Sequence, residues 1–330
     1  MSRPILLFAL LLALARAGAA QEPAMKLVQT IPLPGVEGRL DHFGYDPQRK
    51  RLYLAALGNN SLEVIDLSAG KRINSVKGLQ KPTGIRILAE SGKVVAASGD
   101  DGKVRVYDRD LKLLGEVGGL DDADNVRLDP SGKLAYVGYG DGALAVIDPE
   151  QLKKLGEAKL DGHPESFQLE QDAGRIFVNV PSARQIAVVD RAKMSVIAKW
   201  PLTEAEANFP MALDEKNRRL LVGCRKPAKL LAIDTQTGKT ITSIDCCGDA
   251  DDLFYDASTR RIVLTGGEGC ISVVTQIGAD QYRSEGQVPT AVGARTSFLI
   301  PQDRRLCVAV PHRPSQAAEV RVFQMLAPLP

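Results

Sequence analysis

The sequence predicts an all-β protein, a seven-bladed β-propeller with four antiparallel strands in each blade and a ring closed by the N-terminal strand. The first observation is a recurring motif of two mostly apolar residues followed by aspartate, in which Asp66, Asp108, Asp148, Asp190 and Asp234 are 42, 40, 42 and 44 residues apart. The second is that each unit contains four short runs rich in Val, Ile, Leu and Tyr, bounded by Gly, Pro, Asp and Asn. Four strands every 40–45 residues are typical of a propeller blade.

The first twenty residues precede the repeats and read as a secretory signal peptide. Arg3 is followed by the apolar run 4–15 and then by the small residues 17–20. A basic start, about twelve apolar residues and an A-x-A-like end favour cleavage near Ala20. We therefore expect an exported chain, periplasmic or secreted, in which residues 21–330 form a single propeller domain.

Seven units follow along the rest of the chain. Their inner strands are expected to begin near Asp41, Thr83, Asp124, Glu165, Asn208, Asp251 and Arg295. The third unit illustrates the pattern, because turn residues separate the expected strands 125–128, 134–137, 143–147 and 155–159. The repeated aspartates lie at strand ends, where this residue type caps turns, and we interpret them as turn residues.

The seventh unit ends with the expected strand 319–324 and lacks an outer strand. Residues 26–31 precede the first unit and match the outer strands of other units. We predict that this N-terminal strand completes the last blade, closes the ring and covers an exposed sheet edge.

Two segments carry a resemblance to a known family. The stretches 136–157, YVGYGDGALAVIDPEQLKKLGE, and 52–73, LYLAALGNNSLEVIDLSAGKRI, resemble YVTN-type β-propeller repeats of the bacterial periplasmic YncE-like proteins. The resemblance extends over nearly all of residues 21–330. It implies a propeller fold and an extracytoplasmic scaffold or binding protein, without a common reaction.

Composition excludes several classes of function. Lys and Arg number 42 against 40 Asp and Glu, so bulk charge does not favour a nucleic-acid partner. Beyond residue 20 no apolar run approaches the ~20 residues of a membrane span, and we expect a monomer. The sequence contains no haem-attachment, Walker, nucleophile-elbow or zinc-protease motif.

Charged residues gather where the inner strands begin, at the mouth of the expected channel. The candidate ligand-binding residues there are Asp41, His42, Asp124, Asn125, Glu165, Asp251, Asp252 and Arg295. Such residues also cap turns through backbone N–H groups, and that alternative stays open for each of them. Asp41, Asp124, Glu165 and Asp252 could instead converge on a divalent cation such as Ca²⁺, or Arg39 and Arg295 could neutralise them.

Five cysteines lie in the last third of the chain. In an exported protein we expect a disulfide that joins Cys224 or Cys270 to Cys246 or Cys247. A soft-metal site around Cys246 and Cys247 is the alternative, and Cys307 is expected to be a buried apolar residue.

These observations favour an exported binding or scaffold protein. It would present its top face, which is the face of the ring around the channel mouth, to a protein, a peptide or a small ligand. The alternative is a metal-dependent hydrolase of the lactonase type, in which a divalent ion at the acidic mouth would polarise a carbonyl and activate water.

Overall fold

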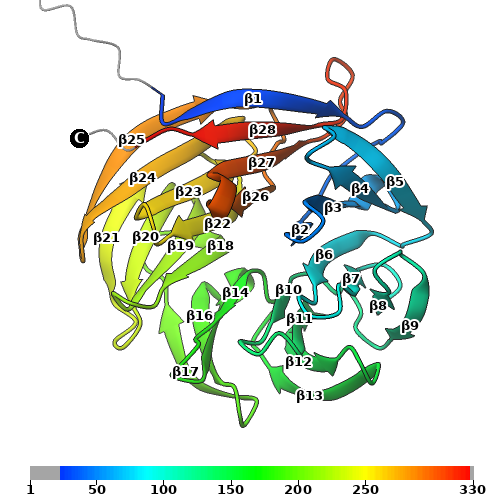
Figure 1. Cartoon of the computed structure of the whole chain (residues 1–330). Helices are drawn as coiled ribbons and strands as arrows, with labels where there is room; N and C mark the ends of the chain where they lie inside the picture. Colours follow the sequence, from blue (N-terminus) through cyan, green and yellow to red (C-terminus); the bar gives the residue numbers. More distant parts are fainter. Residues whose placement is uncertain (1–22, 328–330) are drawn as a thin grey trace, which may run out of the picture.

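The computed structural model describes residues 23–327 of the chain and shows seven four-stranded antiparallel sheets arranged in a ring (Figure 1). The predicted signal peptide lies outside the described residues. Blades are numbered here in chain order. Blade 1 contains β2 (Phe43–Asp46), β3 (Arg51–Ala56), β4 (Ser61–Asp66) and β5 (Lys71–Lys77); blade 2 contains β6 (Pro82–Ile87), β7 (Val94–Ser98), β8 (Lys103–Tyr107) and β9 (Leu113–Val117).

The middle blades repeat this pattern. Blade 3 contains β10 (Val126–Leu128), β11 (Ala135–Tyr139), β12 (Ala143–Asp148) and β13 (Lys153–Lys159). Blade 4 contains β14 (Phe167–Leu169), β15 (Arg175–Val180), β16 (Gln185–Asp190) and β17 (Ser195–Pro201). Blade 5 contains β18 (Glu206–Asp214), β19 (Arg219–Lys226), β20 (Ala228–Asp234) and β21 (Thr240–Asp245).

The last two blades complete the ring. Blade 6 contains β22 (Ala250–Asp256), β23 (Arg261–Gly266), β24 (Cys270–Gly278) and β25 (Gln281–Pro289). Blade 7 contains β26 (Ser297–Ile300), β27 (Arg305–Val310), β28 (Glu319–Met325) and, as its outer strand, β1 (Met25–Pro32). Three short 3₁₀ turns join strands: η1 (Leu57–Asn59), η2 (Pro181–Ala183) and η3 (Pro301–Asp303).

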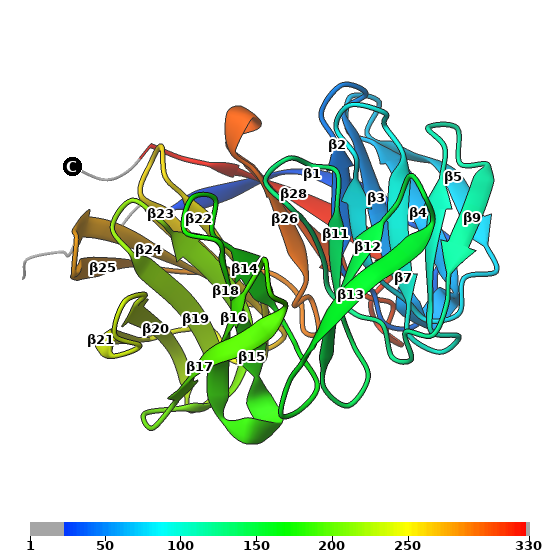
Figure 2. The same ribbon diagram turned by 90° about the horizontal axis from the view of Figure 1, so that it is seen from below.

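Closure by the N-terminal strand is confirmed. β1 pairs antiparallel with β28 from Met25 opposite Met325 to Pro32 opposite Glu319, and both views show the two strands side by side (Figures 1 and 2). The ends of β1 are anchored in the core, because Met25 and Ile31 are buried.

The hydrophobic core lies between the blades. Seven clusters of buried side chains occupy the seven contacts between neighbouring blades. The middle strands supply most of these side chains; β7 and β23, for example, are buried at every position. Strands covered on both faces read as continuous apolar runs, and outer strands such as β17 alternate exposed and half-buried residues.

The repeated aspartates are turn residues, as predicted. A carboxylate oxygen of each one accepts a hydrogen bond from a backbone N–H two or three positions later: Asp66, Asp108, Asp148, Asp190 and Asp234. This geometry caps the turn that leads to the outer strand.

One disulfide joins the loop between β21 and β22 to the first residue of β24. It joins Cys247 to Cys270, while Cys224, Cys246 and Cys307 are free and buried. Cys246 and Cys247 pack in the apolar cluster between these blades.

Candidate functional site

The inner strands deliver charged side chains to one cavity at the channel mouth. Asp41, Asp124 and Glu165 occupy equivalent places just before β2, β10 and β14. The backbone N–H of each donates to a carbonyl of its own blade, those of Ala55, Gly138 and Asn179, at 2.8, 2.9 and 3.0 Å. The backbone thus fixes where each carboxyl enters the channel.

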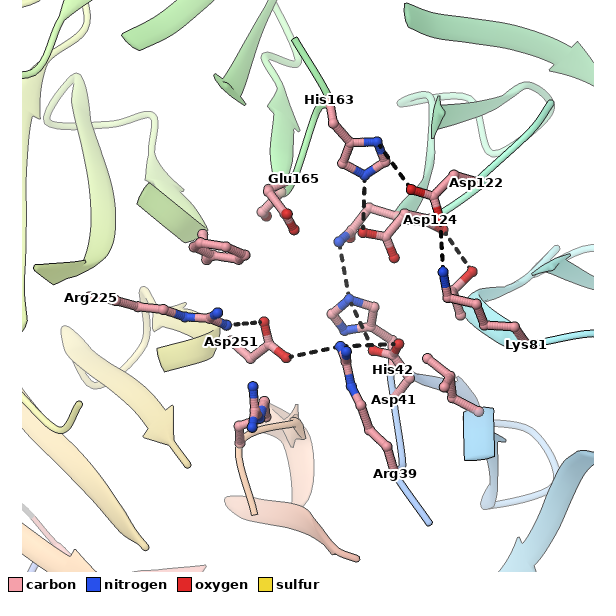
Figure 3. Close-up of a pocket in the computed structure, with 16 residues that line it drawn as sticks. Arg39, Asp41, His42, Lys81, Asp122, Asp124, His163, Glu165, Arg225 and Asp251 are labelled. Atoms are coloured by element: carbon pink, nitrogen blue, oxygen red, sulfur yellow. Dashed lines mark hydrogen bonds and ion pairs between the residues drawn. The ribbon is translucent and has the colours of Figure 1, made fainter. Parts of the chain in front are cut away.

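The upper cavity has a volume of about 210 Å³ and is lined by residues of all seven blades (Figure 3). Seven of the eight predicted site residues line it: Asp41, His42, Asp124, Asn125, Glu165, Asp251 and Arg295. Asp252 lies one step deeper and lines a lower cavity of about 110 Å³. His42 and Ser166 border both cavities, so the two are adjacent along the channel.

His42 links the two levels of the channel. Its Nδ1 lies 3.4 Å from Oδ1 of Asp252, and its Nε2 lies 3.7 Å from Oδ1 of Asp41. Burial opposes protonation, but Asp252 and Asp41 outweigh it and raise the pKa of His42 to about 10. His42 is therefore an imidazolium at neutral pH, with both ring nitrogens as donors.

The amide of Asn125 lies beside this imidazolium, with Nδ2 3.1 Å from Nε2 of His42 and with Oδ1 lacking a hydrogen-bond partner. Turning the amide by 180° would let Oδ1 accept from the ring, which satisfies both groups. Asn125 therefore holds His42 in place.

His163 plays a similar part for Asp124. Its Nδ1 lies 2.7 Å from the carbonyl of Gly140, and its Nε2 lies 3.9 Å from Oδ2 of Asp124. The contact with Asp124 raises the pKa of His163 to about 9. Burial opposes ionisation of Asp124, but His163 and His42 outweigh it and lower the pKa of this carboxyl.

Arginines neutralise the remaining aspartates. Arg225 donates to Oδ1 of Asp251 at 2.8 Å and lies over the ring of Phe209, 3.5 Å from its centroid. Arg39 lies 3.6 Å from Asp41 and 3.8 Å from Asp251. Burial nevertheless raises the pKa of Asp41 to about 7 and also raises that of Asp251.

Glu165 differs from the other carboxyls of the cavity. It projects toward the centre of the ring (Figure 3). Its carboxyl forms no ion pair or hydrogen bond with any side chain or backbone group of residues 23–327. Burial, together with Asp124 and Asp251, raises its pKa to about 8. At neutral pH Glu165 is therefore a mostly neutral carboxyl that can both donate and accept.

The four carboxyls expected to bind a divalent cation do not fit that role. Within residues 23–327, no three His, Cys, Asp or Glu side chains are placed to hold a metal ion together. Three of the four carboxyls face cationic side chains instead: Asp41 faces Arg39, Asp124 faces His163, and Asp252 faces His42. Asp252, moreover, is held at the lower level, where Oδ2 accepts from the N–H of Ser297 at 2.8 Å.

Several lining residues lie outside the set predicted from the sequence. Lys81 and Arg225 enter from a loop and from the end of β19 and carry no repeat signal, whereas Asp122 does, because residues 122–125 (DADN) and 249–252 (DADD) are near copies. Arg86 and Arg127 line the lower cavity. The sequence could have indicated them, because each is the one charged residue within its inner strand, β6 or β10, and these strands belong to neighbouring blades. His312 contacts Glu37 and does not line the cavity.

Comparisons with known proteins identify the fold. No family model matches the chain, and no curated protein matches it. A solved structure of hydrazine synthase from Kuenenia stuttgartiensis aligns with a TM-score of 0.74 and 15% identity, over 88% of this chain and 98% of that chain. A chain of a mitotic checkpoint complex aligns with a TM-score of 0.77 and 12% identity, over 99% of this chain and all of that chain.

At these identities the likeness concerns the fold alone. The likeness agrees with the seven sheets of the structure. Residues 23–327 contain no helix with the length and hydropathy of a membrane span. The chain is a seven-bladed β-propeller.

Proposed function

We propose that this protein is an extracytoplasmic receptor that binds a small polar ligand in the upper cavity. The observation that carries the proposal is the Glu165 carboxyl, which faces a cavity lined by all seven blades and has no hydrogen-bond or ion-pair partner among residues 23–327. Glu165 is half-buried, so its carboxyl remains open to the cavity and is free to hydrogen-bond a ligand. The ligand would offer hydrogen-bond donors and acceptors together, as a polyol or a zwitterion does.

Three further features support this proposal. The cavity presents charges of both signs, with Arg39, Lys81, Arg225 and Arg295 facing the carboxyls. Oδ2 of Asp251 is buried and accepts no hydrogen bond. Phe209 offers an aromatic face, although Arg225 already covers part of it.

Placement outside the cytoplasm is part of the same proposal. It rests on the signal-like residues 1–20 and is supported by the disulfide between Cys247 and Cys270, because such bonds persist in oxidising compartments. Kinship with the YVTN-type propellers, proposed from residues 52–73 and 136–157, points to the same compartment.

The test is a thermal-shift screen of polyols, amino acids and amines, followed by calorimetry on any compound that stabilises the protein. Binding should weaken at least tenfold in Glu165→Ala and less in Glu165→Gln, which keeps the shape and hydrogen-bonding capacity of the neutral acid. Glu204→Gln, on an exposed loop, is the matched control and should bind as the parent does. A ligand that binds Glu165→Ala with unchanged affinity would refute the proposal.

A further inference from the structure

Arg86 and Arg127 occupy the same position in neighbouring blades, on the inner strands β6 and β10. Ile85 pairs with Ala96 of the second strand in blade 2, and Val126 pairs with Val137 in blade 3. Arg86 and Arg127 follow these two residues directly. Since side chains alternate along a strand, both arginines point toward the channel, where they line the lower cavity.

Neither guanidinium has a carboxylate partner within residues 23–327. Nη1 of Arg86 donates to the carbonyls of Ile85 and Phe43, at 2.6 and 3.4 Å. Arg127 donates to the carbonyl of Val126 at 3.2 Å and to Oγ of Ser166 at 3.4 Å. Each guanidinium carries five N–H donors, so these bonds leave several donors unused.

Among the residues that the structure describes, Asp252 is the one acidic side chain lining this cavity, and it is already engaged. Its Oδ2 accepts from the N–H of Ser297 at 2.8 Å, and its Oδ1 faces Nδ1 of His42 at 3.4 Å. The lower cavity therefore presents three cationic groups, counting the His42 imidazolium, against one carboxylate.

Such a balance is unfavourable without an anion. Burial lowers the pKa of Arg86 and of Arg127, and Arg127 lowers the pKa of Arg86 further. Two like charges that are partly buried repel each other more strongly than in bulk water. By contrast, the fully buried Arg261 is paired with Glu285.

The rest of the cavity suits an oxyanion with an organic body. Its volume of about 110 Å³ is well above the ~10–15 Å³ that holds one water molecule. Ser166 and Gln168 add hydrogen-bonding groups, and Phe254 and Phe298 form an apolar wall, with ring centroids 6.1 Å apart.

We infer that the lower cavity is an anion subsite, in which Arg86 and Arg127 bind one carboxylate, sulfate or phosphate group. Guanidinium groups are suited to this task because they bind oxyanions through paired, charge-assisted hydrogen bonds. The anion is either a free ion or the acidic group of a ligand that also occupies the upper cavity, and only the second source rests on the proposed function.

The experiment titrates the purified protein with sodium phosphate and sodium sulfate at constant ionic strength, set with sodium chloride, and follows Tm and binding heat. We expect a saturable rise in Tm for the parent protein. The affinity for the anion should be at least tenfold weaker in Arg86→Met and in Arg127→Met, and the double variant should show no saturable rise. Methionine keeps the apolar stem without the charge. Lys71→Gln, on an exposed strand, controls for the loss of one positive charge.

In the absence of phosphate and sulfate, the single variants should be at least as stable as the parent, because each relieves the repulsion between two cations. Glu165→Gln should still bind phosphate, which separates this subsite from the proposed function. No saturable shift in the parent, or the same shift in the double variant, would overturn the inference.

A second arm identifies the source of the anion. Acetate, glycine and 4-aminobutyrate carry the same carboxylate, and only the last two carry an ammonium group toward the upper cavity. Tighter binding of an amino acid than of acetate, lost in both Arg127→Met and Glu165→Ala, assigns the anion to a larger ligand. If acetate and the amino acids bind with equal affinity, the subsite binds a free anion.

Discussion

At the scale of single residues, the cavity holds protons that the unfolded chain would release. The pKa values of Asp41, Glu165, His163 and His42 are raised to about 7, 8, 9 and 10, against ~3.9, ~4.3 and ~6.5 for Asp, Glu and His in unfolded chains. Between about pH 4 and 10 the folded protein therefore binds more protons than the unfolded one. Stability rises with pH only where the unfolded state binds more protons, so here it falls.

The first prediction concerns this pH dependence. We expect Tm to fall by several degrees between pH 5 and pH 9, because the stabilisation from these raised pKa values is complete below the unfolded values and is lost as pH rises through the folded ones. Glu165→Gln should flatten the fall between pH 5 and 8, and Glu204→Gln should not. Scanning calorimetry across this range measures both, and a Tm that rises toward pH 9 would contradict the linkage.

The second prediction concerns divalent cations. Because Asp41, Asp251 and Asp252 already face cationic side chains, millimolar Ca²⁺ should change Tm by less than about 1 °C. Asp124→Asn combined with Asp252→Asn should leave that response unaltered. A saturable stabilisation by Ca²⁺ that the double variant removes would restore the metal site.

At the scale of elements, blades 5 and 6 show what a sequence can and cannot predict. Four cysteines between positions 224 and 270 predicted a disulfide in an exported protein, but spacing alone left four pairings open. Register decides among them: Cys270 begins β24 opposite Gly266, and a side chain at Gly266 would lie within 2.7 Å of the Cys247 sulfur. Only a glycine there leaves room for Cys247 to reach Cys270.

The third prediction follows from this arrangement. The oxidised protein should show three thiols to a thiol reagent in denaturant, and five after reduction. The folded protein should react slowly, since burial raises the pKa of Cys224, Cys246 and Cys307 to about 12. Five reactive thiols without reductant would exclude the disulfide.

The same scale explains which site residues the sequence could predict. Asp41, Asp124, Glu165 and Asp251 occupy equivalent positions in their blades. The repeat period and the propeller topology were therefore enough to predict that these side chains lie close together. Arg225 and Lys81 follow no repeat, and their side chains span to neighbouring blades, which no local pattern records. Asp252 shares the motif of Asp251, yet strand alternation sends it to the lower cavity.

At the scale of the whole molecule, the repeat length and strand alternation were enough to predict seven blades and the closing strand. The reason is that each blade buries its faces against two neighbours, so the pattern recurs in every unit. What the pattern could not predict is the pairing of charges across the channel, because it joins side chains of different blades, as in the contacts of Asp251 with Arg225 and Arg39.

The fourth prediction tests the closing strand. Ile31→Ala removes a fully buried side chain and should cost about 2–5 kcal/mol, which is on the order of 5–15 °C in Tm at ~2–4 °C per kcal/mol for large domains. Val28→Ala, exposed on the same strand, should stay within about 0.5 kcal/mol. Equal melting temperatures for the two variants would show that β1 does not hold the ring.

The pairing of Met25 with Met325 across 300 positions also has a kinetic consequence. β1 emerges from the ribosome first but cannot pair until β28 has been made, so blade 7 forms last and at the largest loop-closure cost. Contacts that form after the transition state govern unfolding rates more than folding rates. We therefore expect Ile31→Ala to accelerate unfolding in a denaturant jump while refolding keeps nearly its parent rate.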